Sequence, residues 1–268
     1  MSGEDFVSGT SGQVFGVRRT SSAVSLDALL DAVALVRREP WRLRRAARAW
    51  PARRVLALAV ERDDAPNLLS AARRELESSH HHVRFASKTV AGRGKFENLN
   101  ALVEANLVGG YDWLVLIDDD VALPHGFLDA FLFLAERFDL SLAQPAHRRR
   151  SHAAWDVTRR RAASVVRLSN FVEIGPVVAM RASTFDVMLP FPRLRIGWGL
   201  DLHWSQLARE RGWRLGIVDA TPVRHGLRRI ASAYDRSAAF AEAREFLADR
   251  PYVTALEAQQ TLATYRSW

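Results

Sequence analysis

The sequence predicts an α/β protein in which a mostly parallel central sheet is flanked by helices and preceded by a helical extension. Short apolar runs, such as VLALAV (55–60) and WLVLI (113–117), are typical of buried strands. Segments with helical periodicity separate these runs, and strands that alternate with helices favour a parallel sheet covered on both faces. The chain has 268 residues, 48% of them hydrophobic, and is therefore long enough to bury a sizeable core.

The N-terminal part predicts a tail followed by two helices. Residues 1–22 are rich in Gly, Ser and Thr, which is typical of a flexible tail. Ser25 is a candidate cap for a helix that Pro40 ends, and residues 41–50, WRLRRAARAW, form a second, basic amphipathic segment. This segment favours either a helix packed on the domain with solvated arginines, or peripheral contact with an anionic membrane surface.

From residue 53 onward, strands and helices alternate along the chain. We expect strands at 55–60, 81–87 and 113–117, and helices at 67–78, 95–107 and 126–138. The strand that ends at Ile117 is expected to be central in the sheet. The predicted organisation is a tail, a helical extension, a sheet-based domain and a C-terminal helical segment, over residues 1–22, 23–52, 53–235 and 236–268.

Composition excludes several classes of site. The chain has no cysteine, so disulfides, zinc–thiolate sites, iron–sulfur clusters and cysteine nucleophiles are excluded, and any metal must be held by oxygen or imidazole. The net charge of +8 comes almost wholly from arginine, because Lys88 and Lys95 are the only lysines. Together with the many alanines, this bias indicates a GC-rich bacterial genome, and no nucleic-acid partner is expected. A positive surface nonetheless attracts phosphorylated partners.

No targeting or membrane-spanning segment is predicted. The N-terminus lacks the apolar core of a signal peptide, and no stretch reaches the ~20 apolar residues that a transmembrane helix needs. We therefore expect a cytoplasmic protein, with the inner membrane surface as the place of any peripheral contact through residues 41–50.

Three consecutive carboxylates, Asp118, Asp119 and Asp120, follow the predicted central strand. In open α/β sheets, ligand sites lie beyond the carboxyl ends of the strands. Adjacent carboxylates raise one another's pKa unless a cation compensates, and Mg²⁺ or Mn²⁺ bound together with substrate phosphates would do so. If the strand continues in extended form, Asp118 and Asp120 point to the same side and form a D-x-D pair. The alternative is a solvated cluster in which Asp120 caps the helix that starts near Pro124.

The stretch GWGLD (197–201) carries a second candidate site. Gly197 and Gly199 allow the close approach of a ligand, and Trp198 offers a flat face of the kind on which sugars stack. Asp201 falls near the start of a helix, where it either caps the helix or acts as a general base. For the glycines and the tryptophan, the alternative is a turn around a core side chain.

These motifs resemble those of the GT-A nucleotide-sugar glycosyltransferases. YDWLVLIDDDVALPHGFLDAFL looks like the central strand and D-x-D loop of that Rossmann-like fold, and GKFENLNALVEAN resembles the preceding helix in the large inverting family with the broadest bacterial membership. The later segments NFVEIGPVVAMRASTF, GWGLD and GIVDATPVRHG are similar to the second half of the fold. They are also similar to a glycosyltransferase-like family of unassigned function that is common in plants. The resemblance covers residues 53–230.

The resemblance implies a role for each candidate residue. Asp120 and His225 would hold Mn²⁺ or Mg²⁺, and Asp118 would contact the ribose of the nucleotide, or the metal through water. Asp201 would remove the proton of the acceptor hydroxyl, while Glu173 would position donor or acceptor hydroxyls and is the next candidate for the base. The other candidates for donor binding are Lys95, Asp119, Gly197, Trp198 and Gly199.

Two departures from the family pattern limit which roles and which class of glycosyltransferase the resemblance implies. The commonest form of the second motif is Glu-Asp, whereas this chain has Leu200-Asp201, so only the Asp carries over. The Q-x-x-R-W element of processive polysaccharide synthases is absent, and no membrane span is predicted, which argues against a processive synthase.

The predicted function is metal-dependent transfer of a sugar from a nucleoside-diphosphate sugar, with UDP-sugars favoured, to an acceptor hydroxyl, with inversion at the anomeric carbon. A nucleotidyltransferase is one alternative, although no glycine-rich phosphate loop follows VLALAV, and a non-catalytic nucleotide-sugar-binding module is another. The arginine-rich segment 144–161 is either a clamp for phosphate groups or a solvated loop. The triplet His80-His81-His82 lacks the spacing of a helical metal site, which indicates surface residues.

Overall fold

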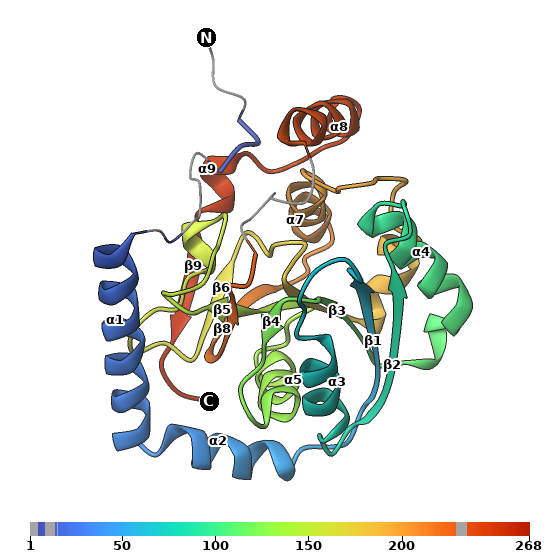
Figure 1. The fold of residues 1–268 in the computed structure, drawn as a ribbon. Helices are drawn as coiled ribbons and strands as arrows, with labels where there is room; N and C mark the ends of the chain where they lie inside the picture. The colour runs from blue at the N-terminus through green and yellow to red at the C-terminus, as the bar shows by residue number, and fades with distance from the viewer. Residues whose placement is uncertain (1–4, 9–13, 15, 229–234) are drawn as a thin grey trace.

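Strands β2 (His82–Thr89), β1 (Arg54–Glu61) and β3 (Trp113–Asp118) lie side by side in parallel at one edge of the sheet (Figure 1). The computed structural model describes residues 5–8, 14, 16–228 and 235–268. Beyond β3 the order continues with β7, β5, β8, β6 and β9, and the short strand β4 pairs with β8. These strands, β4 to β9 in chain order, span Val121–Ala122, Leu142–His147, Val166–Ser169, Val177–Arg181, Leu215–His225 and Thr261–Tyr265.

The sheet is mixed, but most of its strands share one direction. Strands β2, β1, β3, β5, β8 and β9 run the same way, whereas β7 and β6 run against their neighbours. Strand β3 lies between β1 and β7, which confirms the predicted central position of the strand that ends at Ile117. The fold class is therefore α/β, with a central sheet of mostly parallel strands flanked by helices, as predicted.

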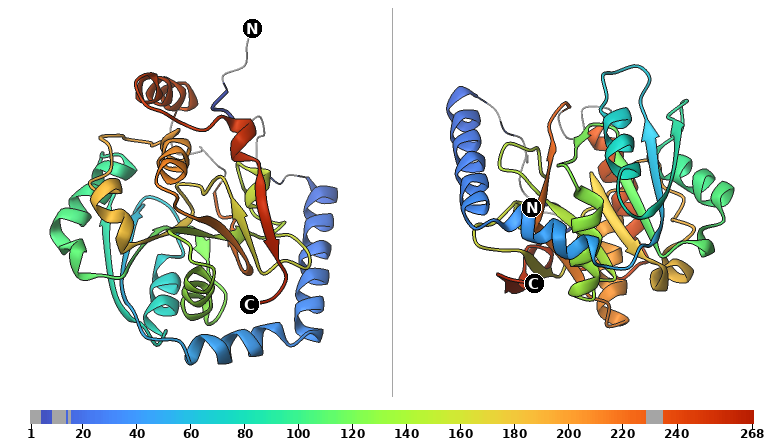
Figure 2. Two further views of the ribbon diagram at one scale, coloured as in Figure 1. Left: turned by 180° about the vertical axis from the view of Figure 1, so that it is seen from behind. Right: turned by 90° about the horizontal axis from the view of Figure 1, so that it is seen from below.

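The strands separate two cores because successive side chains point to opposite faces of a sheet. Val55, Ala57 and Ala59 of β1 pack in one core, while Leu56 and Leu58 pack in the other. Helices therefore cover both faces of the sheet (Figure 2). The first core is covered by α2 (Glu39–Arg48), α3 (Leu69–Glu77) and α5 (Phe127–Arg137), and the second by α4 (Lys95–Asn106), α6 (Phe185–Met188), α7 (Leu200–Glu210) and α8 (Arg236–Ala248).

The basic helix α2 packs on the domain at the amino end of β1 (Figure 1). Leu43 and Ala47 are buried in the first core, and Trp50, just after the helix, donates a hydrogen bond from Nε1 to Glu136 of α5 at 2.6 Å. Leu43, Ala47 and Trp50 of the apolar face are therefore covered by the domain, which supports the packed-helix interpretation. Trp41 stays 54% exposed. Among the described residues, no helix combines the length and apolarity that a membrane crossing requires.

Helix α1 (Val17–Val36) begins within the range predicted as a flexible tail, which corrects the predicted boundary at residue 22. The helix docks on the loop that follows β5, where the buried Asp27 carboxylate accepts the backbone N–H groups of Arg149 and Arg150 at 2.9 and 3.0 Å. Such tertiary support stabilises helices that local composition does not predict. Residues 1–4, 9–13 and 15 of the predicted tail lie outside the described residues.

The C-terminal segment differs from its helical prediction. Helices α8 and α9 (Ala255–Ala258) are followed by β9, which pairs with β6 in antiparallel orientation. The residues of β9, TLATY, alternate between half-buried and exposed, as expected for an edge strand with one face on the protein. The strand is short, and its pairing partner lies almost a hundred residues earlier in the chain, so local periodicity does not reveal it.

Asp31 anchors α1 through two arginines of the same loop. Its carboxylate accepts hydrogen bonds from Arg148 at 2.7 Å and Arg160 at 2.6 Å. Burial raises the pKa of Asp31, but the two guanidinium groups outweigh it and hold the pKa below its ordinary value. We expect Asp31→Asn to lower the free energy of unfolding by less than ~1 kcal/mol, because half-exposed ion pairs contribute little.

The same substitution should nevertheless loosen α1 selectively. Hydrogen exchange measured by mass spectrometry should be faster over residues 17–36 in Asp31→Asn, while the strands keep their protection. Ser25→Asn is the matched control, because it introduces the same side chain at an exposed position of the same helix. Equal exchange of α1 in the two variants would show that Asp31 does not anchor the helix.

Candidate functional site

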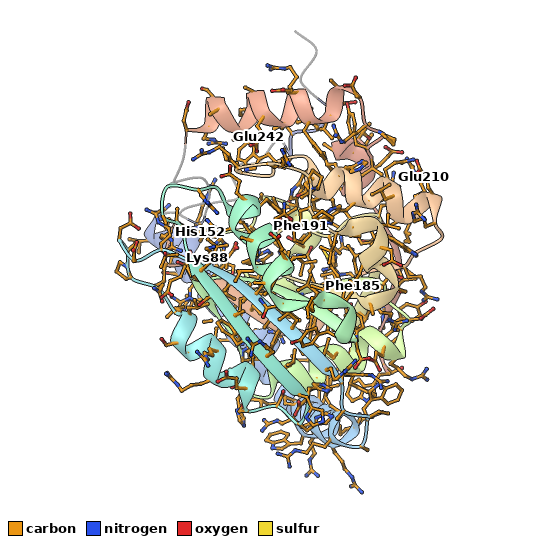
Figure 3. The ribbon with its side chains drawn as sticks, turned by 90° about the vertical axis from the view of Figure 1, so that its right-hand side faces the viewer. Lys88, His152, Phe185, Phe191, Glu210 and Glu242 are labelled. Carbon is orange, nitrogen blue, oxygen red and sulfur yellow. The ribbon has the colours of Figure 1, made fainter. Side chains whose placement is uncertain are left out.

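A cavity of about 870 Å³ opens at the carboxyl ends of β1 and β3. Its walls come from the chain after β1, from loop 90–95, from the carboxylates 118–120 and from loops 152–155, 173–176 and 195–199. Helix α8 lies over the last of these loops (Figure 3). There Glu242 accepts hydrogen bonds from three consecutive backbone N–H groups, those of Arg195, Ile196 and Gly197, at 2.7, 3.0 and 2.8 Å.

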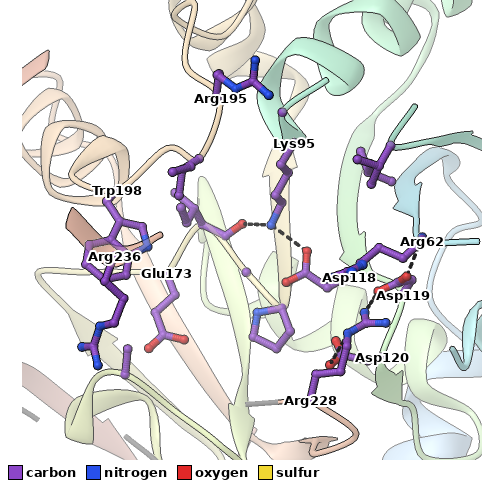
Figure 4. A pocket seen from close by; sticks show the side chains of 18 of the residues that line it. Arg62, Lys95, Asp118, Asp119, Asp120, Glu173, Arg195, Trp198, Arg228 and Arg236 are labelled. Atoms are coloured by element: carbon purple, nitrogen blue, oxygen red, sulfur yellow. Dashed lines mark hydrogen bonds and ion pairs between the residues drawn. The ribbon is translucent and has the colours of Figure 1, made fainter. Parts of the chain in front are cut away.

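Asp118 and Lys95 form an ion pair in the cavity wall (Figure 4). Lys95 Nζ lies 2.6 Å from Asp118 Oδ1 and donates to the carbonyl oxygen of Ile174 at 3.1 Å. Gly175 makes room for the pair, because a Cβ atom at this position would lie 2.7 Å from Asp118 Oδ2 and 2.9 Å from Lys95 Nζ. Two of the predicted donor-binding residues therefore meet here.

The expected extended D-x-D geometry is corrected by the structure. Strand β3 ends at Asp118, and the chain turns through Asp119 and Asp120. Asp119 is 3% exposed and accepts the backbone N–H of Arg62 at 2.8 Å, so it ties the turn to the chain after β1. Burial raises the pKa of Asp119 above its ordinary value, against the opposing effects of the Arg62 N–H and of Arg228.

Asp120 faces His225, the last residue of β8. His225 Nε2 lies 3.0 Å from Asp120 Oδ1, and His225 Nδ1 lies 3.4 Å from the carbonyl oxygen of His152. Burial lowers the pKa of His225, but the Asp120 carboxylate outweighs this effect and raises the pKa above its ordinary value. Burial likewise raises the pKa of Asp120, and the hydrogen bond and charge of His225 reverse the effect.

Asp120 and His225 fit a site for a divalent cation. His225 Nδ1 donates to a carbonyl oxygen, so Nε2 is the nitrogen directed at the carboxylate, and a metal ion can replace the proton between them. The ligand atoms of Asp118, Asp120 and His225 do not all lie within 4.8 Å of one another. Asp118 therefore does not lie close enough to form one group of direct ligands with Asp120 and His225.

Arg228 is a cavity residue that the sequence analysis missed. Its guanidinium group donates to Asp119 Oδ1, lies 3.6 Å from Asp120 Oδ2 and donates to the carbonyl oxygen of Pro66 at 3.3 Å. It therefore compensates the charge of two neighbouring carboxylates. The signal in the sequence was weak, because Arg228 is one of very many arginines and only its position three residues after His225 distinguishes it.

Asp201 is 7% exposed and lines the cavity at the start of α7. The N-cap of this helix is Gly199. The Asp201 carboxylate accepts the N–H of Leu202 at 3.0 Å, and backbone groups of Asp201 and Ile174 also stabilise its ionised form, so the capping alternative is not supported. Burial, and then the nearby charge of Glu173, raises the pKa of Asp201 to about 7. A carboxylate with such a pKa suits proton removal near neutral pH.

Glu173 lies beside Asp201 and is held by several hydrogen-bond donors. Its Oε2 lies 2.9 Å from His147 Nε2, and its Oε1 accepts the backbone N–H of Trp155 at 3.1 Å. His147, which is fully buried at the end of β5, was missed by the sequence analysis. Its position in the sequence, as a polar residue at the carboxyl end of a buried strand, could have indicated that it belongs to the site. These contacts favour a positioning role for Glu173.

The glycine loop before α7 adopts conformations that need glycine. Gly197 and Gly199 have φ angles of 94° and 84°, and a Cβ atom at Gly197 would collide with the ring of Phe96. Trp198 lines the cavity and packs edge-on against Phe240, with 5.1 Å between ring centroids. The structure therefore places all three predicted residues at the cavity or directly behind its wall.

A second group of possible metal ligands lies away from this cavity. Among the described residues, His80, His81 and Asp129 form the group of three whose ligand atoms lie within 4.8 Å of one another. His81 is 5% exposed, so its prediction as a surface residue is wrong. Burial, and then His80, lowers the pKa of His81 to about 4.

The hydrogen bonds of His81 argue against a metal in that group. His81 Nδ1 accepts the backbone N–H of Arg53 at 3.1 Å, so the neutral ring carries its proton on Nε2, the nitrogen that faces Asp129. A protonated nitrogen cannot bind a metal. The pair of Asp120 and His225 is therefore the better candidate.

The arginine-rich segment 144–161 contributes no arginine to the cavity. None of its six arginines, all of them described, is among the cavity-lining residues, and Arg148 and Arg160 bind Asp31 of α1 instead. A clamp for phosphate groups in this segment is therefore not supported. The basic residues that line the cavity are Arg62, Arg93, Lys95, Arg195, Arg228 and Arg236.

The solved structures to which the chain is similar include three distant likenesses. No protein-family model and no curated protein matches the chain. A197 from STIV is 10% identical with a TM-score of 0.45, and the match covers 66% of this chain and 87% of that one. GalNAc-T7, solved with UDP, GalNAc and Mn²⁺, is 11% identical with a TM-score of 0.45, over 66% of this chain and 44% of that one. A mycobacterial protein is 15% identical with a TM-score of 0.45, over 77% and 76%. Likenesses at this distance carry no inference about function.

Proposed function

We propose that the protein transfers a sugar from a nucleoside-diphosphate sugar to an acceptor hydroxyl, with inversion at the anomeric carbon. The observation that carries this proposal is the composition of one cavity. Asp118, Asp120 and His225 lie on one side of it, and the buried carboxylates of Glu173 and Asp201 lie on another. A donor with a charged leaving group needs the first side, where a metal ion can bind. An acceptor hydroxyl that must lose a proton needs the second side, where a carboxylate can act as the base.

The donor nucleotide would bind beside the ends of β1 and β3. Lys95 and Arg228 direct positive charge into this part of the cavity, where they can bind the diphosphate as it leaves. Asp118 is placed to accept hydrogen bonds from a ribose once Lys95 turns to the phosphates. The motif resemblance favours a UDP-sugar as the donor, with Asp119, Gly197, Trp198 and Gly199 completing its site.

Asp120 and His225 would hold Mn²⁺ or Mg²⁺. When bound, the ion supplies positive charge that stabilises the leaving diphosphate. Asp201 would accept the proton of the acceptor hydroxyl, because its carboxylate lines the cavity and its raised pKa makes it a better base than an ordinary Asp. Glu173, held by His147, would position the hydroxyl.

A nucleotidyltransferase and a non-catalytic nucleotide-sugar-binding module remain the alternatives. The buried pair of Glu173 and Asp201 favours the glycosyltransferase, because neither alternative requires a base in that wall. Thermal-shift measurements with UDP-, GDP- and dTDP-sugars, each with and without Mn²⁺, test the proposal. Stabilisation by one nucleotide series that depends on Mn²⁺ is expected, and stabilisation by nucleoside triphosphates alone would favour a nucleotidyltransferase.

The raised pKa of Asp201 predicts the pH dependence of turnover. The base must be ionised, so kcat/KM for the acceptor, which reports the groups of the free enzyme, should rise with pH through about 7 and level off above it. A kcat/KM profile for the acceptor between pH ~5.5 and ~8.5 checks this, and Asp201→Asn should lack the rising limb. A flat profile in the wild type would contradict the assignment of Asp201.

The same pKa predicts an effect on stability. The folded state binds this proton more tightly than the unfolded state, whose carboxyl has a pKa of 3.8. The contribution of Asp201 to the free energy of unfolding is therefore fully present below pH 3.8 and is lost as the pH rises through about 7. The free energy of unfolding, measured with urea at pH ~5.5 and ~8, should differ less between the two pH values in Asp201→Asn than in the wild type.

A further inference from the structure

The side of the cavity that lies away from the acidic turn carries a group of apolar side chains. Phe6, Val7, Ile174, Trp198 and Phe240 line the cavity, and each is half-buried, so part of its apolar surface faces the open space. Figure 4 shows Trp198 and Glu173 on one side of the cavity and the carboxylates 118–120 on the other. Apolar surface held open in a cavity is typical of a site that buries an apolar ligand.

This apolar wall is built from segments that other contacts hold in place. The backbone oxygen of Asp5 accepts the N–H of Ala255 at 2.5 Å, and its carboxylate accepts the hydroxyl of Tyr252 at 2.8 Å. Phe6 then packs against two hydrophobic clusters of the domain. Helix α8 supplies Phe240, whose ring meets Trp198 edge-on. The wall is therefore formed before any ligand binds.

Charged groups line both parts of the cavity. Lys95, Arg62 and Arg228 lie with the acidic turn, where a nucleoside diphosphate would bind. Beside the apolar wall, Asp235 caps α8 through the N–H groups of Ser237 and Ala238, and Arg236 lies next to Trp198 and Glu173 (Figure 4). Glu173 and Asp201 lie between the two parts.

We propose that the acceptor is an alcohol with an apolar body, such as an aryl or alkyl group, which packs against Trp198, Phe240 and Phe6 while its hydroxyl meets Asp201. The inference rests on the proposed function and names the substrate class for its acceptor side. The hydroxyl oxygen forms a bond to the anomeric carbon, and its proton passes to Asp201. The bond from that carbon to the diphosphate oxygen breaks, and the diphosphate leaves with the electron pair. Aromatic side chains give such an apolar body a large contact area.

Titration calorimetry of UDP-loaded protein with matched glucosides tests the inference. Hexyl and phenyl β-glucoside should bind at least ~10-fold more tightly than methyl β-glucoside, because only they carry apolar groups that the wall can bury. 2-Phenylethanol forms a separate arm, since it presents the hydroxyl on an apolar body without a sugar. Its binding would identify the free alcohol as the acceptor, and binding of the glucosides alone would identify a glycoside.

Three variants locate the effect. Phe240→Ala and Trp198→Ala should each remove most of the preference for hexyl over methyl glucoside. Phe240→Ala should in addition leave the affinity for UDP unchanged. Trp41→Ala, a matched change of an exposed tryptophan on α2, should preserve the preference.

Equal affinity for hexyl and methyl glucoside, or a preference that survives Phe240→Ala, overturns the inference. If UDP still binds in either case, the proposed function stands without it. Absence of UDP binding to the wild type, with or without Mn²⁺, overturns both.

Discussion

Asp201→Asn will bind the donor nucleotide as the wild type does but will transfer sugar at least ~100-fold more slowly, because removal of a general base costs ~10²–10⁴ in rate. Asn keeps the size of the side chain and its hydrogen-bonding ability beside Leu202, so the fold of this wall should survive. The loss should appear in kcat, because the base acts on the acceptor proton only in the transition state. Steady-state kinetics with a saturating donor, together with calorimetry of UDP binding, separate the two effects.

Two controls make this result specific to Asp201. Asp186→Asn is the same chemical change at an exposed position on α6, outside the cavity, and should leave kcat unchanged. Glu173→Gln keeps a side chain that can still accept the Trp155 N–H, and should slow transfer less than Asp201→Asn if Glu173 positions the hydroxyl. A larger loss in Glu173→Gln than in Asp201→Asn would make Glu173 the base.

Asp120→Ala, or treatment of the wild type with EDTA, will weaken UDP binding by at least ~100-fold, because the charge stabilisation lost with a divalent metal amounts to several kcal/mol. Asp120 Oδ1 lies opposite His225 Nε2 at 3.0 Å, so its removal takes away one of the two proposed metal ligands. Calorimetric titration of UDP in the presence and absence of Mn²⁺ measures the effect, and circular dichroism verifies that the variant is folded.

Asp129→Ala is the matched control for the metal assignment. Asp129 belongs to the other group of possible ligands, with His80 and His81, and lies away from the cavity. UDP binding in Asp129→Ala should keep its full dependence on Mn²⁺. If Asp129→Ala loses that dependence and Asp120→Ala keeps it, the metal binds to the group of Asp129, His80 and His81, and our assignment of Asp120 and His225 is wrong.

The parts of the fold that local sequence encodes were predictable. The run WLVLI is buried on both faces of β3, and a continuous apolar run is what such a strand requires. Asp118, Asp119 and Asp120 could be placed at the sheet edge from the same argument, because they follow that strand directly. Their individual partners could not, because the turn after Asp118 directs each side chain to a different segment of the chain.

The residues that the sequence analysis missed share a physical reason. Arg228 reaches the acidic turn from more than a hundred residues away, and His147 reaches Glu173 from a neighbouring strand. Contacts of this kind depend on the packed sheet and leave no periodic trace in the local sequence. The same reason explains why the contacts of α1 were not predicted, since its acidic residues bind a loop that follows β5.

Phosphorus NMR of the products tests the central claim most directly. The donor selected by thermal shift is incubated with Mn²⁺ and a panel of alkyl and aryl glucosides, with the wild type and Asp201→Asn in parallel. Our account predicts that the wild type releases the nucleoside diphosphate only as the acceptor is consumed, and that Asp201→Asn releases it at least ~100-fold more slowly. Release of pyrophosphate, or tight donor binding with no release of nucleoside diphosphate under any acceptor, would contradict it.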